Sequence, residues 1–352
     1  MDSKQTFLVI LALAAFVAGV FPFASVRSAG AQEGDQPLSG LLVELTRGPL
    51  VESRHYGRLV AVTPDGEIKV SVGDPRSLVL SRSALKPLQA VATVKLALEQ
   101  GVELTTEEIA LMCASHGAQS YHLRTAEALL RRAGATEDHL HCGPSAGRRL
   151  NHNCSGKHGG MMVQAKIAGD PLDGYWETDH PVQQRIQTAL QEFTGWDQPL
   201  ESGTDGCGVP NYALPLYSIA LGYARLANPE TAPQGYREAA RAIRDAIIAH
   251  PGHLSSRGSF DARLMEQAEG RIITKSGAEA CYGIGIRGDT ALGIAVKIED
   301  GSTRGMQPLL LTALDRLGIM TPQIDDELGR HRTSSITNSR GDVVGEIRAA
   351  DW

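Results

Sequence analysis

The chain has 352 residues, of which 42% are hydrophobic and 21% are charged, so it can bury a large core in one domain or in two smaller ones. Its formal net charge is -6 and it has no dense run of lysine and arginine, which argues against a nucleic-acid or anionic-membrane surface. These features leave small neutral or amino-acid-like substrates as candidates.

The first thirty residues have the layout of a secretory signal peptide. Lys4 precedes the apolar run FLVILALAAFVAGV, and small residues follow at Ala29 and Ala31 in an A-x-A arrangement. We therefore expect residues 1–31 to be removed and the mature protein to be exported, to the periplasm or out of the cell. The alternative is an uncleaved membrane anchor, because the apolar run nearly reaches spanning length.

The next segment, from Leu41 to about Val72, predicts three antiparallel strands. The stretches LLVELTRG, HYGRLVAVTPDG and EIKVSVGD alternate apolar and polar residues. Turn signals separate them at Pro64-Asp65-Gly66 and follow them at Gly73-Asp74-Pro75. This pattern is typical of a β-meander.

The middle of the chain, from Lys86 to about Asp261, carries apolar residues at the i, i+3, i+4 spacing of helices. Two of its stretches are ALKPLQAVATVKLALEQ and ALPLYSIALGYARLA, which we interpret as helices over their whole length.

After Gly270, strands return as RIITKSG, CYGIGIRG and TALGIAVKI, and a last helix follows around QPLLLTALDRLGI. The order of elements predicts an α/β (α+β) fold in which one sheet, assembled from both chain ends, packs against a central helical block. We expect one catalytic domain over residues 32–322. The polar residues 323–352 predict a poorly ordered tail.

Ser83 and Lys86 are the first candidate catalytic residues. Residues three apart lie on one face of a helix, so a hydroxyl and an amine can meet there. A lysine that has lost its proton can accept the proton of a serine and make it a nucleophile. The alternative is that Ser83 caps a helix and Lys86 faces water.

A second motif, Lys275-Ser276-Gly277 on a predicted strand, favours the catalytic interpretation. The combination of S-x-x-K with K-[ST]-G occurs in penicillin-recognising serine hydrolases. Their third element, S-D-N, is missing, and Ser115-His116 stands in the helical block instead. Adjacent side chains point apart, so we interpret His116 as structural. A β-lactamase-like or peptidase-like hydrolase is therefore one alternative function.

Two other stretches, NHNCSGKHGG and SGTDGCGVPN, hold polar residues that an ordinary core would exclude. One contains Cys154, Lys157 and His158, and the other contains Asp205 and Cys207. Thiolates from two segments with nitrogen or carboxylate ligands beside them would suit zinc. The structural alternatives are two buried thiols or, in an exported protein, a Cys154–Cys207 disulfide.

Taken together, the motifs of this chain resemble the L-asparaginase II family of the Rhizobium etli type. They span nearly all of the expected mature chain in order: VESRHYG (51–57), RSALKPLQA (82–90), CASHG (113–117), NCSGKHGGMM (153–162), TDGCGVP (204–210), TKSGAEA and GIAVKIEDG. The resemblance implies hydrolysis of L-asparagine to L-aspartate and ammonia on a fold similar to serine β-lactamases and glutaminases.

The resemblance also implies roles for individual residues. Ser83 with Lys86 and Ser115 with Lys275 look like two Ser-Lys pairs that converge on one site. It leaves open which serine attacks, and whether asparagine or glutamine is preferred.

A zinc site and a substrate site are implied in the same way. The implied ligands of one zinc ion are Cys154, Lys157 and Cys207. Asp205 and His158 would lie beside it and, together with Arg82, bind the substrate. A homodimer is expected by analogy alone.

The predicted signal peptide departs from the resemblance, because family members expected in the cytoplasm lack a leader.

An alternative function from another class is an exported amino-acid-binding protein that has lost turnover. The retained serines and lysines argue against it, since binding needs no nucleophile and base.

Overall fold

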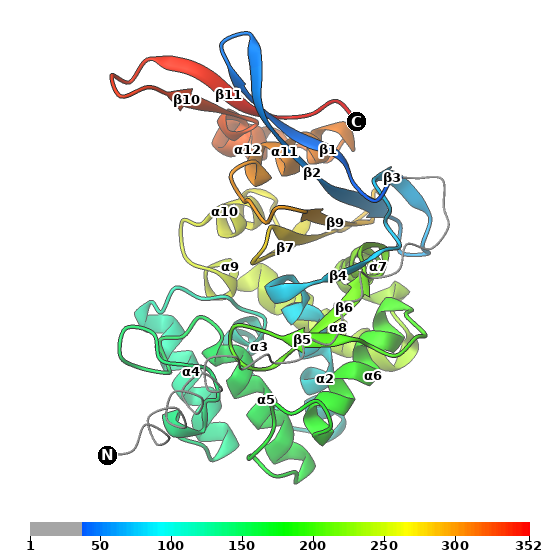
Figure 1. Ribbon diagram of the computed structural model, residues 1–352. Coiled ribbons are helices and arrows are strands. Elements are labelled where there is room, and N and C mark those ends of the chain that lie inside the picture. Colours follow the sequence, from blue (N-terminus) through cyan, green and yellow to red (C-terminus); the bar gives the residue numbers. More distant parts are fainter. Residues whose placement is uncertain (1–36) are drawn as a thin grey trace, which may run out of the picture. The chain divides into compact units, whose positions relative to one another are not determined.

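The computed structural model describes residues 37–352 (Figure 1). The predicted signal peptide, residues 1–31, and its alternative as a membrane anchor lie outside the described residues. Between residues 37 and 352, no helix is both long and apolar enough to cross a bilayer.

A sheet of eight strands is built from the two ends of the described chain, as the sequence predicts. Its central strand β2 pairs with β1 and β3 from the N-terminal half and with β9 from the C-terminal half, always antiparallel. The strand order is β10-β11-β1-β2-β9-β8-β7, with β3 beside β2. The strands are β1 (Gly40–Arg47), β2 (Leu50–Val62), β3 (Ile68–Val72), β7 (Ile272–Gly277), β8 (Cys281–Ile286), β9 (Leu292–Ile298), β10 (Thr333–Thr337) and β11 (Val343–Ala349).

The prediction of a poorly ordered tail after Pro322 is wrong. β11 pairs with β1, with Val43 opposite Ala349, and β10 pairs with β11, so both strands belong to the sheet. Both strands are half-buried or exposed along most of their length, so they carry many polar residues. That composition resembles a loop, although antiparallel strands with one face toward water have it too.

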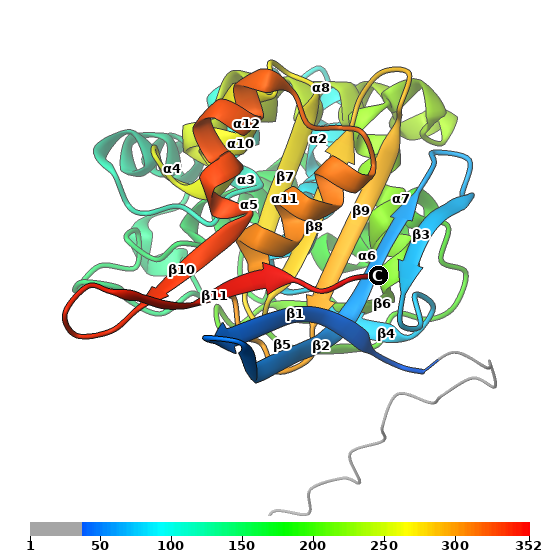
Figure 2. The ribbon, with the colours of Figure 1, turned by 90° about the horizontal axis from the view of Figure 1, so that it is seen from above.

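Helices cover both faces of this sheet. Seen from above, α10 (Phe260–Gln267), α11 (Met306–Arg316) and α12 (Pro322–Leu328) lie over β7, β8 and β9 (Figure 2). Apolar side chains of α11 and of β8 and β9 form one hydrophobic cluster on that face. The remaining helices belong to the helical block on the other face, where a second, larger cluster lies. The longer helices of the block are α2 (Lys86–Glu99), α3 (Thr106–Met112), α4 (Ser120–Ala133), α5 (Ser155–Ala168), α6 (Pro181–Thr194), α7 (Leu216–Ala227) and α8 (Arg237–Ala249).

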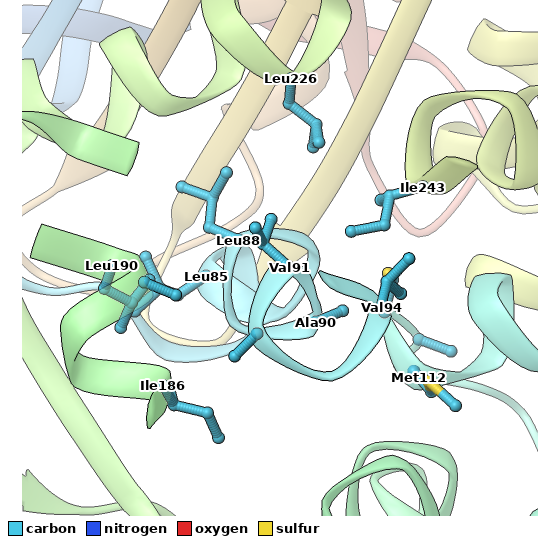
Figure 3. Packing of buried hydrophobic residues seen from close by; sticks show 14 of the residues in the cluster. Leu85, Leu88, Ala90, Val91, Val94, Met112, Ile186, Leu190, Leu226 and Ile243 are labelled. Carbon is cyan, nitrogen blue, oxygen red and sulfur yellow. The ribbon is translucent and has the colours of Figure 1, made fainter. Parts of the chain in front are cut away.

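The helix α2 occupies the centre of the helical block. In Figure 3, side chains of α6, α7 and α8 surround it, represented by Ile186, Leu226 and Ile243. All residues of the helix from Lys86 to Val94 are buried. The first of them, Lys86, has only 1% of its surface exposed.

A small sheet of three short strands, β4 (Leu78–Leu80), β5 (Ser202–Thr204) and β6 (Pro210–Pro215), joins the helical block to the start of α2. The stretch ALPLYSIALGYARLA was predicted to be one helix, but its first residues belong to β6 and the helix α7 begins only at Leu216. Pro215 has an extended conformation and precedes the first helical residue, which is the end of a strand rather than the interior of a helix.

Candidate active site

Five segments that are distant in the sequence meet where α2 begins. They are the 3-10 turn η1 (Arg82–Leu85), the loop after α3, the start of α5, the turn between β5 and β6, and the strand β7. Together they carry all the residues that the sequence predicts for catalysis, substrate binding and metal binding.

Lys86 connects two of these segments. Its Nζ donates to the carbonyl of Ala114 at 2.5 Å and lies 3.0 Å from Ser115 Oγ and 3.2 Å from Cys154 Sγ. The S-x-x-K spacing predicted a pairing of Lys86 with Ser83, one turn away along the chain. In the structure, the serine hydrogen-bonded to Lys86 is Ser115, so a contact across 29 residues replaces the local one.

Ser83 lies in the turn η1 and is half-buried. The alternative that Ser83 caps a helix is wrong, because the residue that precedes α2 is Leu85 and no side chain caps that end. Before it, Arg82 has a φ of 49°, a left-handed conformation that disfavours any side chain with a Cβ by about 1–2 kcal/mol. Such strain is concentrated at functional sites.

The strained turn is held by a neighbouring segment. The backbone N–H of Arg82 donates to Asn211 Oδ1 at 3.0 Å, and its Nε donates to Asp205 Oδ1 at 2.9 Å. On the other side, a Cβ added to Gly277 of β7 would lie 2.9 Å from the backbone nitrogen of Ala84, so the strand approaches the turn closely. Asn211 was not predicted from the sequence, because its role depends on a contact across 129 residues.

Lys275 is fully buried on β7, and its Nζ donates to the Ser276 carbonyl at 2.5 Å. This is not the predicted pairing with Ser115. Burial and the positive charge of Lys86 lower the pKa of Lys275 to about 8, against the opposing effect of the Asp261 carboxylate. A lysine with that pKa can exchange a proton near neutral pH.

Asp261 is a further residue of the site that sequence analysis missed. It is buried in the first turn of α10, and its Oδ2 accepts hydrogen bonds from the backbone N–H and the hydroxyl of Ser276, at 3.2 and 2.6 Å. Its other oxygen accepts the hydroxyl of Tyr282. An acidic residue in the first turn of a helix is common, so nothing in the sequence around Asp261 distinguishes it from the others.

The thiols of Cys154 and Cys207 form a second region beside the lysine–serine contact. Their mutual hydrogen bond lowers the pKa of Cys154 and raises that of Cys207, which places the thiolate on Cys154. Asp205 Oδ2 lies 3.5 Å from Cys207 Sγ and 3.7 Å from Lys157 Nζ. Burial alone would lower the pKa of Lys157, but the sulfurs of Cys207 and Cys154 and the Asp205 carboxylate outweigh it and raise that pKa.

The donors for a metal ion in this region are two thiols and the amine of Lys157, with Asp205 beside them. All five cysteines of the chain are free, so the structure does not contain the alternative Cys154–Cys207 disulfide. Within residues 37–352, no three His, Cys, Asp or Glu side chains are grouped in a way that could hold a metal ion. A metal site here would therefore need Lys157 as its third donor.

His158 follows Lys157 but turns to a different partner. Its Nδ1 lies 2.6 Å from the hydroxyl of Tyr175, and burial lowers its pKa well below the usual range, so the ring is neutral. Its Nε2 is buried and has no hydrogen-bond partner among the described residues. The observed contacts of His158 thus do not include Arg82 or Asp205, the other two residues predicted to bind substrate.

Comparison with known proteins gives one match that covers nearly the whole described chain. A family model described as L-asparaginase II matches residues 43–349. None of the curated proteins compared with the chain matches it. Among solved structures, a β-lactamase from Mycobacterium bovis is similar at 14% identity and a TM-score of 0.45, over 74% of this chain and 94% of that one. The protein Mglu in its glutamate form is similar at 16% identity and a TM-score of 0.32, over 75% of this chain and 61% of that one.

Proposed function

The chain belongs to the L-asparaginase II family, and from this premise we propose that it hydrolyses L-asparagine to L-aspartate and ammonia through a serine activated by lysine. The family makes it an amidohydrolase of the asparaginase type. The observation that carries the finer proposal is the contact of the buried Lys86 amine with the Ser115 hydroxyl, at 3.0 Å.

The first half of the proposed reaction transfers an acyl group to Ser83. The Ser83 oxygen forms a bond to the side-chain amide carbon of the substrate, and its hydroxyl proton passes by way of Ser115 to Lys86, which takes part in this step in its neutral form. The carbon–nitrogen bond then breaks, and the departing nitrogen receives that proton and leaves as ammonia. The half-buried position of Ser83 and the strained backbone before it support its choice as the nucleophile.

In the second half, the oxygen of a water molecule forms a bond to the acyl carbon of the aspartyl ester, the bond from that carbon to the Ser83 oxygen breaks, and the proton taken from water passes to the Ser83 oxygen as L-aspartate leaves. Lys275 is suited to accept a proton from this water, because its pKa of about 8 leaves part of the population neutral near pH 7. Arg82 remains our candidate for the substrate carboxylate, although its Nε is already bound to Asp205.

The test of this proposal is ammonia release from L-asparagine by residues 32–352, beside Ser83→Ala and Ser115→Ala variants. We expect release by the parent and near-background release by Ser83→Ala. Rapid quenching and mass spectrometry of the parent should find an added aspartyl group on the peptide that contains Ser83. Absence of ammonia release by the parent, with zinc supplied and thiols reduced, would reject the proposal.

We also propose that one zinc ion binds to Cys154, Lys157 and Cys207. The donor set suits zinc, because two thiols lie in hydrogen-bond contact and a nitrogen donor and a carboxylate lie beside them. Binding would require Lys157 to lose its proton, which a nearby cation favours. Three protein donors would leave one open position on the ion, where the amino or carboxylate group of the substrate could bind and so be oriented. Elemental analysis of the purified parent and of a Cys207→Ser variant tests this, with about one zinc per chain expected in the parent alone.

A β-lactam hydrolase is the second candidate function. The close approach of Gly277, in the K-S-G motif, to the turn that carries Ser83 favours it, since this motif pair is used by penicillin-recognising enzymes. The missing S-D-N element and the cysteine-bearing motifs argue against it. Turnover of a chromogenic β-lactam, without release of ammonia from asparagine, would favour this alternative.

A further inference from the structure

Two histidines are stacked beside the loop that carries Ser115. The ring centroids of His116 and His122 lie 5.1 Å apart, and 3% and 0% of the two residues' surfaces are exposed. Each ring accepts a backbone N–H on Nδ1, from Ala118 at 3.2 Å and from Gln119 at 3.1 Å respectively. Neither contact belongs to the proposed catalytic machinery.

These contacts fix the protonation of both rings. A ring nitrogen that accepts an N–H carries no hydrogen, so the neutral ring has its hydrogen on Nε2. His116 Nε2 then donates to Ser155 Oγ at 2.9 Å, and His122 Nε2 donates to the carbonyl of Gly252 at 2.8 Å. Burial lowers the pKa of both rings, which agrees with this assignment.

His122 binds the same short helix that holds the backbone of Ser115. Gly252 lies in the short helix α9 (Pro251–Leu254), and the carbonyl of Leu254 at the end of that helix accepts the backbone N–H of Ser115 at 3.0 Å. The segments also pack tightly, because a Cβ added to Gly117 would lie 2.3 Å from Ser256 Oγ. The position of α9 therefore determines where the Ser115 backbone is held.

His116 holds the same loop from the other side. Its ring binds Ser155 at the start of α5, next to Cys154, and its own backbone N–H donates to the carbonyl of Asn153 at 3.1 Å. The Ser115 loop is thus held between α9, through His122, and α5, through His116.

We propose that His122 is a positioning residue, which holds α9 so that the Ser115 hydroxyl stays within reach of the Lys86 amine. Its ring does not contact the proposed reacting groups, and it acts through Gly252 and Leu254. The kinetic part of the proposal rests on the proposed asparaginase reaction. The structural part, the protection of the Ser115 backbone N–H, does not.

Three substitutions of His122 separate the two hydrogen bonds of its ring. The side-chain amide of His122→Gln reaches the place of Nε2 and keeps a donor for Gly252. The side-chain oxygen of His122→Asn lies near the place of Nδ1 and keeps an acceptor for Gln119. His122→Ala keeps neither.

The expected results follow from the bond to Gly252. His122→Ala should lower kcat for asparagine about 100-fold with little change in KM, because small misplacements of catalytic groups have effects of that size. His122→Gln should recover most of the loss and His122→Asn should not. Hydrogen–deuterium exchange should be faster than in the parent for the peptide containing Ser115 in His122→Ala and His122→Asn, and close to the parent in His122→Gln.

A matched control is available at His180. Its Nδ1 also accepts a backbone N–H, from Val182 at 3.2 Å, and its Nε2 donates to the carbonyl of Pro171 at 3.1 Å, but it lies at the start of α6 and contacts none of the site residues. His180→Ala should reduce thermal stability without changing kcat.

The outcomes separate the two proposals. A parent enzyme that releases no ammonia would overturn the proposed function, and the exchange of the Ser115 peptide would still decide the positioning role. If the parent is active and His122→Ala has the same kcat, the positioning role would be overturned. If His122→Ala does not fold, equal kcat values for His122→Gln and His122→Asn would do the same.

Discussion

Lys275 and Lys157 are both buried, with 0% and 5% of their surfaces exposed, yet their surroundings shift their pKa values in opposite directions. For Lys275, burial and then the positive charge of Lys86 lower the pKa to about 8. Lys157 faces the thiol sulfurs of two cysteines and the Asp205 carboxylate, and its pKa rises. Burial acts in the same direction on both lysines, so their different charged neighbours decide which one is suited to accept a proton and which one stays protonated beside negatively charged groups.

The largest effect is expected from Lys86→Met, because Lys86 joins these two regions. It removes the amine that contacts both Ser115 and Cys154. The loss of a proton acceptor should reduce kcat for asparagine by about two to four orders of magnitude. Steady-state ammonia release measures this.

The control for this variant is Lys95→Met, on the same helix. Lys95 is paired with Glu99 near the surface and lies outside the site. We expect its kcat to equal that of the parent. Comparable losses in both variants would mean that α2 responds to any lysine substitution, and the role assigned to Lys86 would be rejected.

The lowered pKa of Lys275 predicts a specific dependence on pH. Folded Lys275 loses its proton near pH 8 and the unfolded side chain near pH 10.5, so between these values the unfolded chain binds more protons. The free energy of unfolding of the parent should therefore rise with pH across this window, relative to Lys275→Met, by up to about 3 kcal/mol. Below pH 8 the difference should be constant. Urea denaturation at several pH values measures it.

The same protonation should appear in the activity. If neutral Lys275 accepts a proton in the second half of the reaction, kcat should rise with pH and approach a plateau above about pH 8. A parent whose stability relative to Lys275→Met falls between pH 8 and 10.5 would show that the charged form is favoured, and the contrast with Lys157 would be lost.

Much of the fold, and which segments of the chain meet at the candidate site, could be predicted from the sequence. Alternation predicted β1 to β3, and the motifs around Ser83, Cys154 and Lys275 predicted segments that do meet in space. What the sequence could not supply is which side chains touch, because those contacts join distant segments. The serine hydrogen-bonded to Lys86 is Ser115, and Asp261 reaches β7 from α10.

The errors in the fold have a similar origin. Strand β6 reads as part of a helix because it is buried along its whole length, so its apolar residues do not alternate with polar ones. Strands β10 and β11 read as a tail because they are half-buried or exposed along their length, so polar residues are common in them. In each case the position of the strand in the tertiary structure, and not its own sequence, determines its pattern.

A smaller effect is expected from removing the negative charge of Asp205 beside Lys157. Asp205→Asn removes the carboxylate that pairs with both Arg82 and Lys157. Breaking a largely buried ion pair is destabilising, and since the cysteine sulfurs still face Lys157, we expect a loss of about 2 kcal/mol in the free energy of unfolding. Asp351→Asn removes a fully exposed carboxylate paired with Arg316 and should change stability little. Equal effects in urea denaturation would show that Asp205 does not stabilise the thiol region.

The smallest effect is expected from Ser276→Ala, which tests how the strand of Lys275 is held. The Ser276 hydroxyl donates to Asp261 Oδ2 at 2.6 Å, while the backbone N–H of the same residue donates to that oxygen at 3.2 Å and is retained in the variant. Because one of two hydrogen bonds remains, the free energy of unfolding should fall by only about 1 kcal/mol. Ser71→Ala on β3, whose hydroxyl donates to the neutral carbonyl of Gly73, is the control and should lose less. If Ser276→Ala instead lowers kcat as far as Lys86→Met does, the Ser276 hydroxyl itself takes part in the reaction. Proton transfer would then involve both Lys275 and Ser276, and not Lys275 alone.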